Sequence, residues 1–209
     1  MKKLTAPLVL LVVLTAYVTN VHAASTKMIT ESFDTTGLER LELNISIAEL
    51  DIEIYEGDTV DVEILLEGER RFFGFSREDV DDIDLAQDVM GSALYLTIED
   101  RDIEQHWLVR VPAKLALEVE LGVGEVSVEG VRNALDMEVG VGEVRVSVFE
   151  EAINEIWLDV GVGDAIFRGM NERVDNERSF ISDGARYFGQ GEHNIRIDLG
   201  VGEVRVRGE

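Results

Sequence analysis

The chain has 209 residues, and its 43 acidic and 19 basic side chains give a formal net charge of −24. A surface of this charge repels nucleic-acid phosphates and anionic lipid headgroups, so nucleic acid is excluded as a partner and cationic ligands are electrostatically favoured. An acidic, lysine-poor surface is also a general adaptation for solubility. Cysteine is absent, which excludes disulfides, a lipoprotein anchor and a Cys-His pair.

The first 23 residues have the pattern of a Sec signal peptide. Lys2-Lys3 precedes an apolar run over residues 8–18, which is shorter than the roughly 20 residues that span a bilayer. Val-His-Ala at 21–23 matches the small-x-small cleavage pattern, so we expect cleavage after Ala23 and no stable membrane insertion afterwards. The expected location is the periplasm, with the extracellular space or cell surface as alternatives. Cleavage removes two lysines and no acid, which takes the net charge to −26.

Residues 24–39 form a lead-in, and residues 40–209 form the repeat domain. Its first copy, LELNISIAELDIEI from Leu41, is degenerate, with Ser46 and Ala48 where later copies have glycine. Alternation and β-propensity indicate three further strands, at residues 59–66, 93–99 and 107–111. Short helical turns are expected near residues 78–87 and 149–155. An insertion covers residues 69–88.

A ten-residue phrase then occurs four times, as LGVGEVSVEG, VGVGEVRVSV, VGVGDAIFRG and LGVGEVRVRG. The leading glycines are 18, 21 and 39 residues apart, which indicates a unit of about 20 residues. Apolar residues alternate up to each Gly-Val-Gly, and their parity changes after it, as from Leu121 to Val126. We therefore expect a corner at each copy, where glycine permits positive φ or close backbone approach. The corner glycines are Gly122, Gly124, Gly140, Gly142, Gly161, Gly163, Gly200 and Gly202.

Stacking these units predicts an all-β, single-domain parallel β-solenoid with coils of about 20 residues, in which like side chains form ladders. In the alternative fold each Gly-Val-Gly is a hairpin loop, and the chain forms an antiparallel β-sandwich of repeated hairpins. A second insertion, near residues 171–193, spans about one coil. It is either a distorted coil or a loop outside the stack, and the polar composition of residues 175–178 favours a loop there.

The run WLVRVPAKLAL from Trp107, followed by EVELGVGEV, resembles the bacterial toast-rack family of β-strand repeats, whose members are adhesin-like domains of unknown function. In that family a strand ending in Val-Pro leads into successive glycine-punctuated strands. The resemblance covers about residues 40–209. It implies a β-solenoid in an envelope or surface-associated protein, without established catalytic residues. This chain departs from the family pattern in its acidic corners and in the insertion at residues 171–193.

An acid stands two residues before and three residues after each leading glycine. Stacked strands lie about 4.8 Å apart, so each column of acids brings like charges together unless water or cations intervene. One hypothesis is a calcium ladder, because calcium prefers oxygen ligands. The alternative, which we favour, is that the acids face solvent and oppose aggregation. These acids are Glu120, Glu125, Glu138, Glu143, Asp159, Asp164, Asp198 and Glu203.

The sequence offers little that suits catalysis. Only His106 and His193 follow the leader, no G-x-S-x-G is present, and the G-x-G units lack the third glycine and the lysine of a phosphate-binding loop. We therefore expect no cofactor and no enzymatic activity. A carboxylate-based polysaccharide-active enzyme is the remaining catalytic alternative.

Together these features predict a non-enzymatic, exported structural or binding module of the bacterial envelope, adhesin-like, with an unknown protein or envelope component as partner. One alternative is a polysaccharide-active or calcium-dependent surface protein that uses the acidic corners. Another is an envelope-stress accessory that binds cationic peptides. Arginine and aromatic residues at 70–75 and 186–188 are either recognition patches or caps over the solenoid core.

Overall fold

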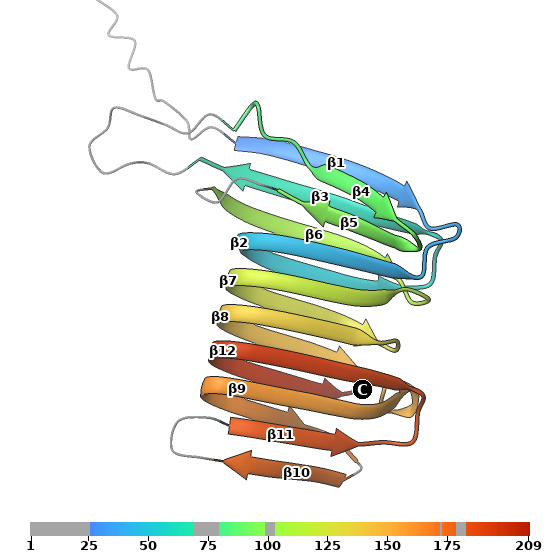
Figure 1. Ribbon diagram of the computed structural model, residues 1–209, viewed down its shortest axis with the longest axis vertical. Coiled ribbons are helices and arrows are strands. Elements are labelled where there is room, and N and C mark those ends of the chain that lie inside the picture. Colours follow the sequence, from blue (N-terminus) through green and yellow to red (C-terminus); the bar gives the residue numbers. More distant parts are fainter. Residues whose placement is uncertain (1–25, 69–79, 99–102, 172, 179–182) are drawn as a thin grey trace, which may run out of the picture.

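The computed structural model describes residues 26–68, 80–98, 103–171, 173–178 and 183–209, and the predicted signal peptide and the stretch 70–75 lie outside them. Twelve strands form one open sheet, so the all-β prediction is confirmed (Figure 1). One short 3₁₀ helix, Glu150–Ala152, lies within the predicted helical turn at 149–155. None of these described segments contains a helix long and apolar enough to span a membrane.

Five strands of 14 to 16 residues build the middle of the molecule. Each turns back on itself at its centre, at the left of the view in Figure 1. We call the part before this corner the first arm and the part after it the second arm. In β7, Leu121 of the first arm and Val126 of the second are both buried in the same core. The five strands are β2 (Arg40–Tyr55), β7 (Ala116–Val131), β8 (Leu135–Val148), β9 (Ile153–Arg168) and β12 (His193–Gly208).

The five long strands stack in parallel and in register, in the order β2-β7-β8-β12-β9. Like side chains therefore form ladders, as predicted. Val126 of β7 pairs with Val144 of β8, which pairs with Val204 of β12, and all three are buried. The alternative of repeated antiparallel hairpins is wrong for these strands, because every pair among them is parallel.

The stacking order differs from the chain order. Strand β12 lies between β8 and β9, although β9 precedes it in the sequence. The residues between them form the antiparallel hairpin of β10 (Arg173–Arg178) and β11 (Asp183–Phe188), which pairs with the first arm of β9. The insertion is therefore neither a coil of the stack nor a loop outside it, and the loop predicted at residues 175–178 is wrong. Alternating buried side chains at Ala185 and Tyr187 place β11 against the core.

At the other end, two short strands continue the two arms of β2. β5 (Ala93–Thr97) pairs with its first arm and β6 (Glu104–Pro112) with its second, both in parallel. Antiparallel strands complete this end: β4 (Ala86–Met90) beside β5, β3 (Thr59–Glu67) beside β6, and β1 (Thr26–Asp34) beside β3. The three short strands predicted from alternation are confirmed. Residues 80–87 of the stretch predicted to be helical form a turn and the start of β4 instead, and residues 78–79 of it lie outside the described residues.

The corner glycines are required by the close approach of the neighbouring strand. A Cβ atom added to Gly142 would lie 1.7 Å from the carbonyl oxygen of Gly124, and one on Gly124 would lie 1.8 Å from that of Ala48. Ala48 itself can carry a side chain because β2 pairs with β5 only as far as Asn44 and with β6 only from Glu49. At the other corners a neighbouring strand approaches closely and requires glycine. Beside Ala48 no described residue of β5 or β6 pairs with β2.

Candidate functional site

The residue at the tip of each corner, between two glycines or, in β2, between Ser46 and Ala48, points outwards and is apolar in all five long strands. These side chains are 42 to 51% exposed and pair with one another in register from β2 to β9. At about 4.8 Å per strand they make a continuous apolar line roughly 19 Å long. We call this line the corner ridge. In stacking order it comprises Ile47, Val123, Val141, Val201 and Val162.

The sequence analysis placed a corner at these residues and missed their exposure. The sequence does contain a signal for this exposure. The glycines are explained by the turn of the strand, but the turn gives no reason for a β-branched apolar side chain at a tip that faces solvent. The recurrence of such a residue in every copy, including the degenerate copy with Ile47, points to a use for the exposed surface.

The acids after the corners form one column along the second arms, with arginines beside it. Arg145 Nη2 lies 2.6 Å from Glu143 and its Nη1 lies 3.3 Å from Glu125. The hydrogen bond to Glu125 is the largest cause that raises the pKa of Arg145. Arg205 pairs with both Glu143 and Glu203. This column is thus partly neutralised within the chain.

The acids before the corners form a second column, along the first arms, with fewer cations. Asp198 pairs with Arg196 at 2.6 Å, and Asn44 donates a hydrogen bond to Glu120. The carboxylates of Glu138 and Asp159 have no hydrogen bond or ion pair with any residue that the structure describes. The two flanks of the corner ridge are therefore both acidic, and the first-arm flank has fewer ion pairs.

The eight predicted acids do lie in two in-register columns, four on each side of the corners. No group of three or more histidine, cysteine or acidic side chains in the described ranges is arranged to hold a metal ion. We therefore do not carry the calcium hypothesis into the proposed function. His106 lies in β6 and His193 in β12, which are not neighbouring strands, so the two histidines do not form a joint site.

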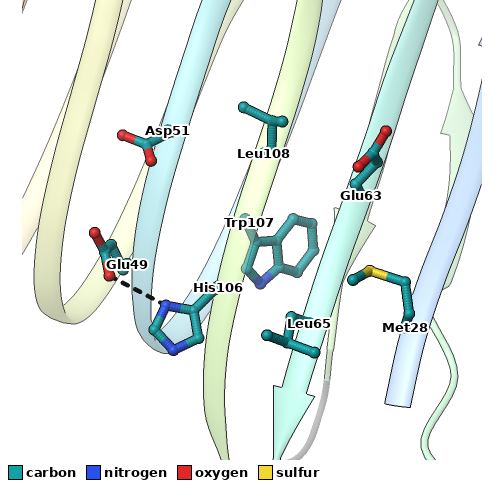
Figure 2. Close-up of a pocket in the computed structure, with 8 residues that line it drawn as sticks. All are labelled: Met28, Glu49, Asp51, Glu63, Leu65, His106, Trp107 and Leu108. Atoms are coloured by element: carbon teal, nitrogen blue, oxygen red, sulfur yellow. Dashed lines mark hydrogen bonds and ion pairs between the residues drawn. The ribbon is translucent and has the colours of Figure 1, made fainter. Parts of the chain in front are cut away.

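A shallow hollow of about 250 Å³ lies on the outer face of the second-arm layer, beside the β2 end of the corner ridge (Figure 2). Exposed Met28 and Leu108 lie in it with Leu65. His106 Nδ1 is 3.1 Å from Glu49 Oε2, and its Nε2 is 3.6 Å from Glu104. We call this site the β6 hollow. It is lined by Met28, Glu49, Asp51, Glu63, Leu65, His106, Trp107 and Leu108.

The arginine and aromatic residues at 186–188 have two separate roles. Tyr187 is fully buried, and its hydroxyl donates to Glu150 at 3.1 Å, so this residue caps the core. Arg186 lies over the exposed ring of Trp157, with its guanidinium 4.1 Å from the ring centroid, and Arg196 lies 5.9 Å from the same centroid. Trp157 was missed by the sequence analysis, although it occupies an outward position of an alternating strand.

Neither protein-family models nor curated proteins match the chain. Among solved structures, a candidate cell adhesion protein from Clostridium sporogenes is similar with a TM-score of 0.51 and 15% identity, over 88% of this chain and 100% of that one. A candidate adhesin from Parabacteroides merdae has a TM-score of 0.33 and 11% identity, over 87% of this chain and 78% of its own. The second score is too low to support an argument. The first shows that the fold of this chain also occurs in the Clostridium protein.

Proposed function

We propose that this chain is a non-enzymatic, exported binding module of the bacterial envelope that presents the corner ridge to a protein partner. The observation that carries the proposal is the exposure of five apolar side chains in one unbroken line. Contiguous exposed apolar surface, rimmed by polar groups, is typical of an interaction site. The adhesin-like role is supported by the fold shared with a candidate cell adhesion protein.

The partner that fits this surface is apolar along its centre and basic along its sides. Acid columns flank the ridge on both arms, and the carboxylates of Glu138 and Asp159 have no hydrogen bond or ion pair with the residues described. Basic groups on a partner would neutralise them, and the net charge of −24 favours the approach of such a partner. Cationic amphipathic polypeptides are therefore the proposed class of ligand.

The non-enzymatic part of the proposal is supported by what the site offers chemically. The ridge itself contains no nucleophile, acid or base, and its flanking acids are exposed or half-buried rather than enclosed. A carboxyl group that serves as a general acid or base at neutral pH typically has its pKa shifted by burial or by neighbours. Binding through apolar contact and charge is the function that this surface supports best.

Binding of a designed peptide tests the proposal. The probe is a blocked eight-residue peptide of alternating leucine and lysine, with a leucine and glutamate peptide as its charge-reversed counterpart. We expect residues 24–209 to bind the lysine peptide and to lose affinity as salt is raised. The triple variant Val123→Thr, Val141→Thr, Val201→Thr should bind about three- to tenfold more weakly, because each half-exposed methyl lost costs a few tenths of a kcal/mol.

The control variant is Val89→Thr, which changes a valine in β4 that is also exposed, at 57%, and lies away from the ridge. It should bind as the unchanged protein does. The proposal is wrong if the lysine peptide does not bind, or if the ridge variant and the Val89→Thr variant bind it equally well.

A further inference from the structure

The β6 hollow combines an apolar floor with a pair of acids that flank it. Leu108 in β6 is 45% exposed and Met28 in β1 is 60% exposed, and both lie in the hollow (Figure 2). In the sheet register Leu108 pairs with Glu63 of β3 on one side and with Asp51 of β2 on the other. An exposed leucine therefore stands between two exposed carboxylates.

The same strands show what such a pair of acids binds. Two residues along β6, Arg110 occupies the position equivalent to that of Leu108, between Asp61 of β3 and Glu53 of β2. Its Nη1 lies 3.7 Å from Asp61 and its Nε lies 3.5 Å from Glu53. One guanidinium thus neutralises both flanking acids, and the Tyr55 ring lies 4.3 Å below it. The two acids on either side of Arg110 are therefore already neutralised within the chain.

Among the described residues, the row of Leu108 has no such cation. The carboxylates of Asp51 and Glu63 have no hydrogen bond or ion pair with any other described residue. They lie two strands apart, about 9.6 Å, so one cation above Leu108 would lie between them. His106, at the corner side of the hollow, is engaged by Glu49 and Glu104. The hollow therefore has the charge and the apolar floor for a long basic side chain, and no described residue of the chain supplies one.

We propose that the β6 hollow is a socket for one arginine or lysine side chain of a protein partner. Its methylene groups would lie on Leu108, Leu65 and Met28, and its charged end would bridge Asp51 and Glu63 in the way that Arg110 bridges the next row. The socket lies beside the corner ridge and does not depend on it. The socket can therefore bind a partner even if the corner ridge does not, and the ridge can do so even if the socket does not.

Methyl NMR of residues 24–209 tests the socket. The probe is the blocked tripeptide Gly-Arg-Gly, and the blocked tripeptide Gly-citrulline-Gly is its neutral isostere. We expect millimolar arginine peptide to shift the methyl signals of Met28, Leu65 and Leu108, and the citrulline peptide to leave them unchanged. The double variant Asp51→Asn, Glu63→Gln should bind the arginine peptide about three- to tenfold more weakly, in line with two exposed ion pairs.

The matched control is Glu129→Gln with Asp136→Asn, which removes two exposed acids elsewhere and changes the net charge equally. It should reduce binding much less than the socket variant. Leu108→Arg supplies the cation from within the chain, since it repeats the arrangement of Arg110, and it should abolish the peptide-induced shifts at Met28 and Leu65.

Three results would each overturn the socket: no shift with the arginine peptide, equal shifts with the citrulline peptide, or equal weakening in the socket and control variants. Unchanged peptide binding by a folded Leu108→Arg protein would do the same. The ridge variant with three threonines should keep the shifts in the hollow, so failure of the ridge and failure of the socket give different results.

Discussion

The middle of this molecule and its two ends are built on different principles. In the middle, five strands repeat one corner and stack in parallel, and in four of them the neighbouring backbone lies so close at the corner that glycine is required. At the ends, β1, β3 and β4 and the hairpin of β10 and β11 pair antiparallel and have no corner. The middle is therefore specified by backbone contact, whereas the ends depend on amphipathic alternation and on individual polar contacts.

The largest expected effect comes from adding one methyl group in the middle. In Gly142→Ala the new Cβ would lie 1.7 Å from the carbonyl oxygen of Gly124, so β7 and β8 would have to separate at the corner. We expect a loss of more than about 4 kcal/mol of unfolding free energy, or no folded protein. Urea denaturation measures this loss.

Gly37→Ala is the matched change at an end. Gly37 has a positive φ of 79°, but nothing lies within 4 Å of an added Cβ. The expected cost is about 1 to 2 kcal/mol, from the left-handed conformation alone. Equal losses for Gly37→Ala and Gly142→Ala would contradict the special role of backbone contact in the middle.

The next effect distinguishes buried from exposed valines of the middle. Val144 is fully buried in the ladder of second arms, whereas Val141 is 46% exposed on the corner ridge. Val144→Thr should lower the unfolding free energy by about 1 to 3 kcal/mol, because it buries a hydroxyl group. Val141→Thr should change it by less than about 0.5 kcal/mol. A large loss at Val141 would mean that the ridge serves the fold rather than a partner.

At the end of the molecule formed by β10 and β11, one side chain accepts the hydrogen bond of a buried main-chain N–H group. The buried Asp183 Oδ2 accepts a hydrogen bond from the main-chain N–H of Ala165 at 3.1 Å. Asp183→Ala should cost about 1 to 3 kcal/mol, because this N–H loses its acceptor, and Asp183→Asn should cost less because it retains an oxygen. Thermal unfolding of the two variants compares them. Identical melting temperatures would show that this contact does not hold the end in place.

The smallest expected effect is that of calcium. Arginines already pair with the acids of the second arms, through Arg145 and Arg205, and the described residues contain no metal-binding cluster. Millimolar calcium should therefore raise the melting temperature no more than magnesium does. A rise specific to calcium would restore the cation ladder as an explanation of the acid columns.

The repeated part of the fold could be predicted because its signals are local. The corner can be predicted from the alternation of apolar residues and from its change of parity after each Gly-Val-Gly. The small residues Ser46 and Ala48 indicate the same corner in the first copy. The position of β12 could not be predicted, since its corner sequence LGVGE fits equally well beside any other copy and no local feature specifies its neighbours. The strand β10 was predicted to be a loop because an edge strand with polar side chains lacks the apolar alternation that identifies a strand.

The candidate sites were harder to predict than the fold. The corner ridge is visible in the sequence once the outward face of the corner is considered as well as the inward face. The β6 hollow is not visible, because it brings together Met28, Glu63, Leu108 and Asp51 from four strands whose order and register follow only from the structure. Its significance also depends on the comparison with Arg110 in the next row.

The central claim is that β12 completes the corner ridge between β8 and β9, and cysteine cross-linking tests it most directly because the chain has no cysteine of its own. Neighbouring ridge positions lie about 4.8 Å apart, within the range that a disulfide spans, and alternate positions lie too far apart. The structure predicts rapid oxidation of the pair Val141→Cys with Val201→Cys and of the pair Val201→Cys with Val162→Cys, and none for Val141→Cys with Val162→Cys. Efficient cross-linking of that last pair would show that the strands stack in chain order and would contradict the account.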